Sequence, residues 1–257
     1  MKPHLLIGTP CYGGNLSVNY FHAIRRLLPL LEQQGIAVSF KTLAQESLIS
    51  RARNTIVAEF LGRPECSHLL FIDADIGFEP ELVPRLLAHG QLLVCAAYPM
   101  KAYNWDKVLE AAKTAGSSEA LKRASLQFAA NMRDEDWPQD TDRNRLDIVN
   151  GFVRVSKAAT GMMLIERQVF ERLKSACPQL QYNNDVAGYD NPHTRGNFWT
   201  FFDTLVHPVS RRYLSEDYAF CYRWTQACQG EIWLDIESRL SHHGNVAFAG
   251  SFLESAG

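Results

Sequence analysis

The sequence lacks several features that would assign a protein to a common class. Its six cysteines include no C-x-x-C pair, which argues against a zinc ribbon or a redox dithiol. No apolar run approaches the roughly 20 residues that span a bilayer, and the first residues are too short to form a signal peptide. The formal charge of −2 gives no global basic field toward nucleic acid or anionic membranes, although a local basic groove is compatible with it. We therefore expect a cytoplasmic protein with free, mostly buried cysteines.

The 257 residues, 46% of them hydrophobic, are enough to build one large core. The first hundred residues alternate between apolar strand-like runs and segments with helical periodicity. We expect strands at residues 4–8, 36–43, 69–72 and 92–97, and helices at 17–34, 47–61 and 80–88, with Ser17 as the cap of the first helix. This alternation predicts a mostly parallel α/β sheet with helices on both faces.

The second half of the chain departs from that alternation. We expect helices at residues 106–115, 168–176 and 215–229 and strands at 151–156, 160–165 and 232–235, so that the sheet acquires antiparallel strands. The charged stretch at 132–145 is either a solvated loop or a flap over the active site that orders when the donor binds. Residues 178–199 predict an irregular loop, and the aromatic stretch Tyr182–Phe202 is a candidate for sugar or acceptor contacts, or else closes the edge of the core.

The sharpest local signal is a pair of carboxylates, Asp73 and Asp75, directly after the expected strand at 69–72. In extended backbone both side chains point the same way, and open α/β sheets bind ligands beyond the carboxyl ends of their strands. Two ionised carboxylates about 6 Å apart repel by roughly 3 kcal/mol, a cost that a bridging divalent cation offsets. Oxygen ligands suit Mg²⁺ or Mn²⁺. The alternative is that both residues cap the following turn.

Two later segments add titratable groups. Glu216 and Asp217 stand in the first turn of the expected helix at 215–229, where they either complement the helix dipole or supply a general base. His242 precedes the Gly244 turn, after the last expected strand and before a tail of small residues, and is a candidate third metal ligand or a structural histidine.

The ordered set of Asp73-Ala74-Asp75, Ser215-Glu216-Asp217 and Leu240-x-His242-x-Gly244 resembles glycosyltransferases of the GT-A fold, in particular the family 2-like nucleotide-sugar glycosyltransferases. Supporting segments are Thr9-Pro10, Ser50-Arg51-Ala52-Arg53-Asn54, Tyr98-Pro99-Met100-Lys101 and Thr160–Ile165. The resemblance extends from about residue 4 to 250. It implies a single Rossmann-like GT-A domain over residues 1–257, with a nucleotide-binding half at 1–100, a helical and polar insertion at 101–150, and an acceptor and metal-completing half at 151–257.

The resemblance also implies roles for individual residues. Asp75 and His242 would hold Mn²⁺ or Mg²⁺, with Asp73 against the ribose or the water shell of the metal. Thr9 and Pro10 would meet the nucleotide base, and Arg51 or Arg53 the base or phosphate, unless those arginines belong to an exposed helix face. Asp217 matches the base of inverting members, with Glu216 as the next candidate.

These features predict a metal-dependent glycosyltransferase that uses a UDP- or GDP-sugar, most simply with inversion, while retention stays open. The acceptor is left open among a glycan, a lipid-linked sugar, another hydroxyl and a modified DNA base. One alternative is a nucleotidyltransferase, although Gly13-Gly14 lacks the nearby Lys of a phosphate loop. Another is a non-catalytic nucleotide-sugar-binding module of the same fold.

Overall fold

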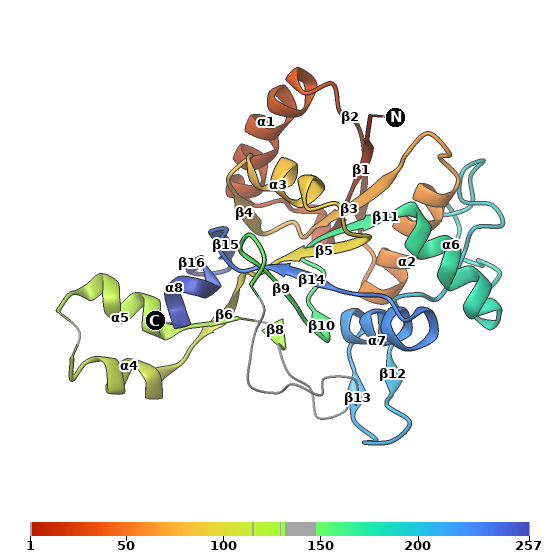
Figure 1. Ribbon diagram of the computed structural model, residues 1–257. Helices are drawn as coiled ribbons and strands as arrows, with labels where there is room; N and C mark the ends of the chain where they lie inside the picture. Colours follow the sequence, from red (N-terminus) through yellow and green to blue (C-terminus); the bar gives the residue numbers. More distant parts are fainter. Residues whose placement is uncertain (1, 115, 129, 132–147, 257) are drawn as a thin grey trace.

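A mixed sheet of seven strands forms the centre of the molecule (Figure 1). The computed structural model describes residues 2–114, 116–128, 130–131 and 148–256. The strand order is β2-β1-β3-β11-β5-β14-β9. These strands are β1 (His4–Cys11), β2 (Ala37–Ala44), β3 (His68–Ile72), β5 (Leu93–Ala96), β9 (Phe152–Arg154), β11 (Met162–Glu166) and β14 (Trp233–Asp235).

Most strands of this sheet run in one direction. β1 pairs in parallel with β2 and β3, and β5 pairs in parallel with β14. β11 lies between β3 and β5 and is antiparallel to both, and β9 is antiparallel to β14. The prediction of a parallel first half that acquires antiparallel strands from the second half is confirmed.

Helices cover both faces of the sheet, as predicted (Figure 1). One face carries α1 (Val18–Gln33) and α3 (Leu82–Ala88), and the other carries α2 (Ile49–Leu61), α6 (Arg167–Ala176) and α7 (Glu216–Cys228). Successive side chains of a strand point to opposite faces, so Leu5 and Ile7 join the hydrophobic cluster under α1, and Leu6 joins the one under α2. The Ser17 Oγ accepts a hydrogen bond from the Tyr20 N–H at 3.1 Å, so this predicted helix cap is confirmed.

Several short strands pair outside the central sheet. β4 (Ile76–Phe78), β15 (Leu240–His243) and β16 (Ala247–Gly250) form a three-stranded antiparallel sheet. Residues 240–243 do follow the strand at 233–235, but the sequence did not predict that they form a strand of their own. The other pairs are β6 (Pro99–Tyr103) with β7 (Leu126–Phe128), β8 (Ala130–Asn131) with β10 (Lys157–Ala158), and β12 (Leu205–Val206) with β13 (Tyr213–Leu214).

The region after β6 is largely helical. α4 (Trp105–Ala111) matches the predicted helix, α5 (Ser118–Ser125) was not expected, and α8 (Phe252–Ala256) packs against α5. Two short 3-10 helices, η1 (Tyr12–Gly14) and η2 (Pro178–Leu180), complete the elements. The charged stretch at 132–145 lies outside the described residues. The two residues just before it, 130 and 131, form β8. In the described part of the chain, no helix is both long and apolar enough to cross a membrane.

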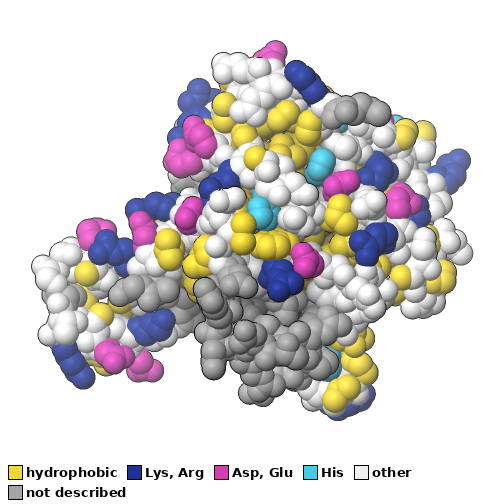
Figure 2. All heavy atoms as spheres, in the orientation of Figure 1, with side chains coloured by type: hydrophobic (Ala, Val, Ile, Leu, Met, Phe, Trp, Pro, Cys, Tyr) yellow, Lys and Arg dark blue, Asp and Glu magenta, His cyan; other side chains and the backbone are white. Residues whose placement is uncertain are grey.

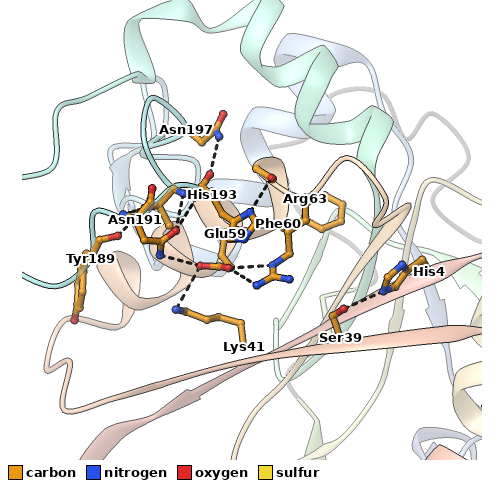
Figure 3. Close-up of polar contacts among 12 residues, drawn as sticks. His4, Ser39, Lys41, Glu59, Phe60, Arg63, Tyr189, Asn191, His193 and Asn197 are labelled. Atoms are coloured by element: carbon orange, nitrogen blue, oxygen red, sulfur yellow. Dashed lines mark hydrogen bonds and ion pairs between the residues drawn. The ribbon is translucent and has the colours of Figure 1, made fainter.

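Hydrogen bonds to the buried Glu59 carboxylate join the segment that follows η2 to α2 (Figure 3). The Glu59 carboxylate accepts hydrogen bonds from Arg63 at 2.7 Å and from the Asn191 side chain at 3.2 Å, and lies 3.4 Å from Lys41 Nζ. Glu59 needs these partners because an unpaired buried charge is costly.

The six cysteines are all buried and free, as predicted.

Candidate active site

A cavity of about 800 Å³ opens at the carboxyl ends of β1 and β3. This is the edge at which open α/β sheets bind their ligands. Residues from both halves of the sequence line it: Pro10, Tyr12, Asn15, Leu16, Ser17, Glu46, Ser47, Ile49, Arg53, Asp73, Ala74, Asp75, Tyr98, Glu216, Asp217 and His242.

Backbone hydrogen bonds hold the Asp73-Ala74-Asp75 turn between β3 and β4. The Asp73 N–H donates to the Gly161 carbonyl at 3.0 Å, and the Asp75 carbonyl accepts from the His243 N–H at 2.9 Å. The Ala74 carbonyl accepts from the Ser17 N–H at 2.8 Å, which ties the turn to the start of α1. Three segments that are far apart in the sequence thus hold the backbone that carries the two carboxylates.

Strand pairing brings His242 beside Asp75. β15 pairs with β4 so that His242 is opposite Ile76, the residue after Asp75. His242 Nε2 lies 3.3 Å from Asp75 Oδ1, and Lys101 Nζ contacts Asp75 Oδ2. Burial raises the pKa of Asp75, but contacts with His242 and Lys101 prevail and lower it to about 2.

In its neutral form, His242 would turn a bare nitrogen toward Asp75. Its Nδ1 lies 2.9 Å from the Pro99 carbonyl oxygen, which can only accept, so Nδ1 carries the proton. Asp75 Oδ1 is buried and receives no hydrogen bond from the described residues. With the ring neutral, two acceptor atoms face each other at 3.3 Å. A cation between them would satisfy both.

A divalent ion fits this pair of atoms. Adjacent ligands around Mg²⁺, each at about 2.1 Å, are about 3 Å apart, close to the observed separation. An Nδ1–H bonded to a carbonyl is also the usual support of a histidine that binds a metal through its other nitrogen. Among the described residues there is no group of three or more His, Cys, Asp or Glu side chains that could hold a metal. The protein would supply two ligands and leave the remaining positions to a bound substrate and water.

Arg53 joins the first half of the site to the second. Its side chain is 5% exposed; Nη2 donates to Asp73 Oδ1 at 3.1 Å, and Nε lies 3.4 Å from Glu216 Oε1. The third nitrogen, Nη1, is buried without a hydrogen-bond partner in the described part of the chain. The expected metal ligand Asp73 is therefore paired with a guanidinium, and Arg53 has one NH₂ group, Nη1, to offer a ligand.

The two acidic residues at the start of α7 have different surroundings. Burial raises the pKa of the Glu216 carboxyl, and the charge of Asp217 adds to the rise while Arg53 opposes it. Asp217 accepts hydrogen bonds from the Ser215 hydroxyl and from the Tyr218 N–H at 2.8 Å, both within its own turn. Glu216 is thus paired with Arg53. Asp217 lines the cavity and has no ion pair among the described residues, so it can contact a ligand there.

Of the four residues expected to meet the base or phosphate (Thr9, Pro10, Arg51 and Arg53), two line the cavity and two do not. Pro10 and Arg53 line the cavity. Thr9 is fully buried, with its hydroxyl 2.7 Å from that of Tyr20, so it supports α1 from beneath the cavity wall. Arg51 lies outside the lining residues and pairs with Glu46 at 2.7 Å. The roles of all four in donor binding stay predictions.

Other lining residues carried no functional signal in the sequence. Tyr98 is 9% exposed, and its hydroxyl accepts the Gly161 N–H at 3.1 Å. A Cβ on Gly161 would lie 2.5 Å from that hydroxyl, so only glycine allows this approach. Glu46 comes from the connection between β2 and α2, Ile49 from the first position of α2, and Tyr12 from η1. Tyr98 and Gly161 belong to segments that the resemblance had included without a role.

The aromatic stretch at 182–202 lies elsewhere. Trp199, Phe201 and Phe202 are buried in the core beneath α2 and α6, and no lining residue comes from this stretch. The expectation that it contacts a sugar is not supported, whereas its alternative, a segment closing the edge of the core, agrees with this burial.

On the face in Figure 2, basic and acidic side chains are interspersed rather than gathered by sign.

Comparisons with known proteins give little on which to base a function. No protein-family model matches the chain. No curated protein matches it either. Among solved structures, it is similar to A197 from STIV at 14% identity and a TM-score of 0.47, with 94% of this chain and 86% of that chain covered. It is also similar to GalNAc-T7, solved with UDP, GalNAc and Mn²⁺, at 12% identity and a TM-score of 0.42, with 94% and 44% covered. Both TM-scores are below 0.5, so neither similarity bears on the activity of this chain.

Proposed function

We propose that this chain is a glycosyltransferase of the GT-A fold that moves a sugar from a UDP- or GDP-sugar to an acceptor hydroxyl. The observation that carries the proposal is the facing pair of Asp75 Oδ1 and His242 Nε2, 3.3 Å apart at the carboxyl edge of the sheet. The same cavity holds a buried arginine, Arg53, and a second carboxylate site at Glu216 and Asp217. A cation site, an anion-binding group and a separate base are the parts that such a transfer needs.

Asp75 and His242 would hold Mn²⁺ or Mg²⁺ together with the donor diphosphate. A bound ion there would offset the charge that grows on the nucleoside diphosphate as it leaves. Arg53 would direct its free Nη1–H toward the donor, since a guanidinium matches phosphate and ribose oxygens. Asp73, held by Arg53, would then contact the ribose rather than the ion. Residues 1–100 would form the nucleotide-binding half in this scheme.

Asp217 would act as the general base. It would take the proton of the acceptor hydroxyl while the hydroxyl oxygen bonds to the anomeric carbon and the carbon–oxygen bond to the diphosphate breaks. Attack from the side opposite the leaving group inverts the configuration. Asp217 suits this role better than Glu216 because Glu216 is bound to Arg53. Burial raises the pKa of Glu216, but its bond to Arg53 holds the carboxylate and leaves it less free to turn toward an acceptor hydroxyl.

The decisive experiment is a screen of UDP- and GDP-sugars for released nucleoside diphosphate, with Mn²⁺ and with a chelator. We expect release that depends on the ion and that Asp75→Asn abolishes. Asp190→Asn is the matched control, because Asp190 forms an exposed ion pair with Arg195 away from the cavity. Release of pyrophosphate instead would indicate a nucleotidyltransferase. Binding of nucleotide-sugar without any turnover would indicate a binding module.

A further inference from the structure

Lys101 stands beside the proposed ion site without a role in the function given above. It belongs to β6, the strand whose Pro99 carbonyl orients His242. From there its ammonium contacts Asp75 Oδ2, while His242 faces Oδ1 of the same carboxylate. One short strand thus supplies a positive charge to one oxygen of Asp75 and orients the histidine that faces the other oxygen.

The lysine side chain passes close to Gly244. A Cβ on Gly244 would lie 3.3 Å from Lys101 Cδ and 3.7 Å from Cε. The stem therefore runs along the bare backbone at the turn between β15 and β16. A Cβ at Gly244 would make one tight and one ordinary contact with the lysine, so the glycine gives the stem slightly more room.

Lys101 and a divalent ion would compete for one negative charge. An ion on Asp75 Oδ1 would lie next to an ammonium on Oδ2, and two neighbouring positive charges repel strongly when partly shielded from water. The Lys101 side chain is 37% exposed and Asp75 34%, so the ammonium can leave toward solvent without unfolding anything. Asp75 has the shorter side chain, and its backbone carbonyl accepts a hydrogen bond from the His243 N–H, so its carboxylate stays near His242.

We infer that Lys101 is a tethered cation that occupies Asp75 until the divalent ion binds, and that it then binds the donor diphosphate. This rests on the proposed function, since it assumes an ion and a diphosphate at the same place. A displaced ammonium on a four-carbon stem stays within a few Å of Asp75, where the diphosphate must also lie to share the ion. Lysine binds phosphate as a mobile point charge, which suits such a transfer.

The inference predicts effects of opposite sign for a single substitution. Lys101→Gln should bind Mn²⁺ alone about three- to tenfold more tightly than the wild type, because a competing charge is gone. The same variant, once loaded with Mn²⁺, should bind UDP or GDP about 10- to 100-fold more weakly, because an ionic hydrogen bond to phosphate is lost. Lys101→Arg keeps the charge and should change both affinities much less.

Calorimetric titration tests both effects directly. Mn²⁺ is titrated into each protein, and then UDP and GDP into the Mn²⁺-loaded proteins. The matched control is Lys174→Gln, which breaks a lysine–carboxylate pair with Glu171 on α6. Unchanged thermal midpoints establish that every variant is folded.

Two results would overturn the inference. Equal Mn²⁺ affinity in Lys101→Gln and the wild type would refute the competition, and equal nucleotide affinity would refute the contact with phosphate. A failure of the proposed function has a different signature: the wild type binds no Mn²⁺ even with nucleotide, or Asp75→Asn binds it undiminished. That signature would remove the function and the inference together.

Discussion

Glu46 should couple the stability of the molecule to pH. Its side chain is 3% exposed and accepts hydrogen bonds from Arg51 Nε at 2.7 Å, from the Leu48 N–H at 2.9 Å and from the Tyr189 hydroxyl at 2.8 Å. These bonds join the connection between β2 and α2 to the segment after η2. Hydrogen bonds from Arg51 lower the pKa of Glu46 to about 2, against the opposing effect of burial.

The size of the effect follows from that shift. A fall from the ordinary 4.5 to about 2 corresponds to roughly 3 kcal/mol of folding free energy. Arg51 is 40% exposed, so water screens the pair and we expect about 2 kcal/mol. Because the folded-state pKa is the lower one, this stability is fully present above the unfolded pKa. It is lost as the pH falls from about 5 to 2.

Glu46→Gln keeps the shape of the side chain and removes its charge. The variant should be about 2 kcal/mol less stable to unfolding than the wild type at pH 7, and the difference should nearly vanish near pH 2. Denaturant unfolding of wild type and variant at pH 7, 5, 4 and 3 measures the difference. Glu119→Gln, which breaks an exposed pair with Lys122, is the control and should leave the midpoint unchanged. A deficit that is the same at pH 7 and pH 3, or absent at pH 7, would refute the reasoning.

Three further substitutions probe the cavity. Asp217→Asn should leave nucleotide binding nearly intact and slow transfer by about 10²–10⁴-fold in an assay of the released nucleoside diphosphate; a wild-type rate would shift the base to Glu216. Arg53→Met should cost about 3–5 kcal/mol in denaturant unfolding, because it leaves two carboxylates without their buried partner; a change below 1 kcal/mol would contradict that role. Tyr98→Phe should cost about 1–3 kcal/mol, since the Gly161 N–H loses its acceptor, and an unchanged unfolding midpoint would count against it.

The sequence by itself determined the layered α/β core. Period-2 and period-3.6 patterns placed β1, β3, α1, α2, α6 and α7 within a few residues, because each buries one face or all of itself in a large core. It also placed Asp73 and Asp75 after a buried strand and Glu216 and Asp217 at a helix start, since local pattern alone defines such ends. These carboxylates meet at one cavity.

Only the tertiary structure decided which neighbours complete the site. Arg51 and Arg53 differ by roughly 200° around a helix, and every residue of α2 except Ile49 and Arg51 is buried, so packing sent Arg53 inward and Arg51 to Glu46. Hydrophobic periodicity in the sequence could not predict which arginine is buried, because polar and apolar residues are both buried in α2.

The ion site depended still more on pairing between distant segments. His242 and His243 point to opposite sides of β15: the first faces Asp75, and the second bonds to Asn19 at 2.9 Å and to Ser241 at 2.7 Å. Strands as short as β4, β6 and β15 carry too few residues for a periodic signal, so neither their existence nor their register could be foreseen. The register of β15 on β4 placed the histidine, and the packing of β6 against β15 placed the lysine, on the two oxygens of one aspartate.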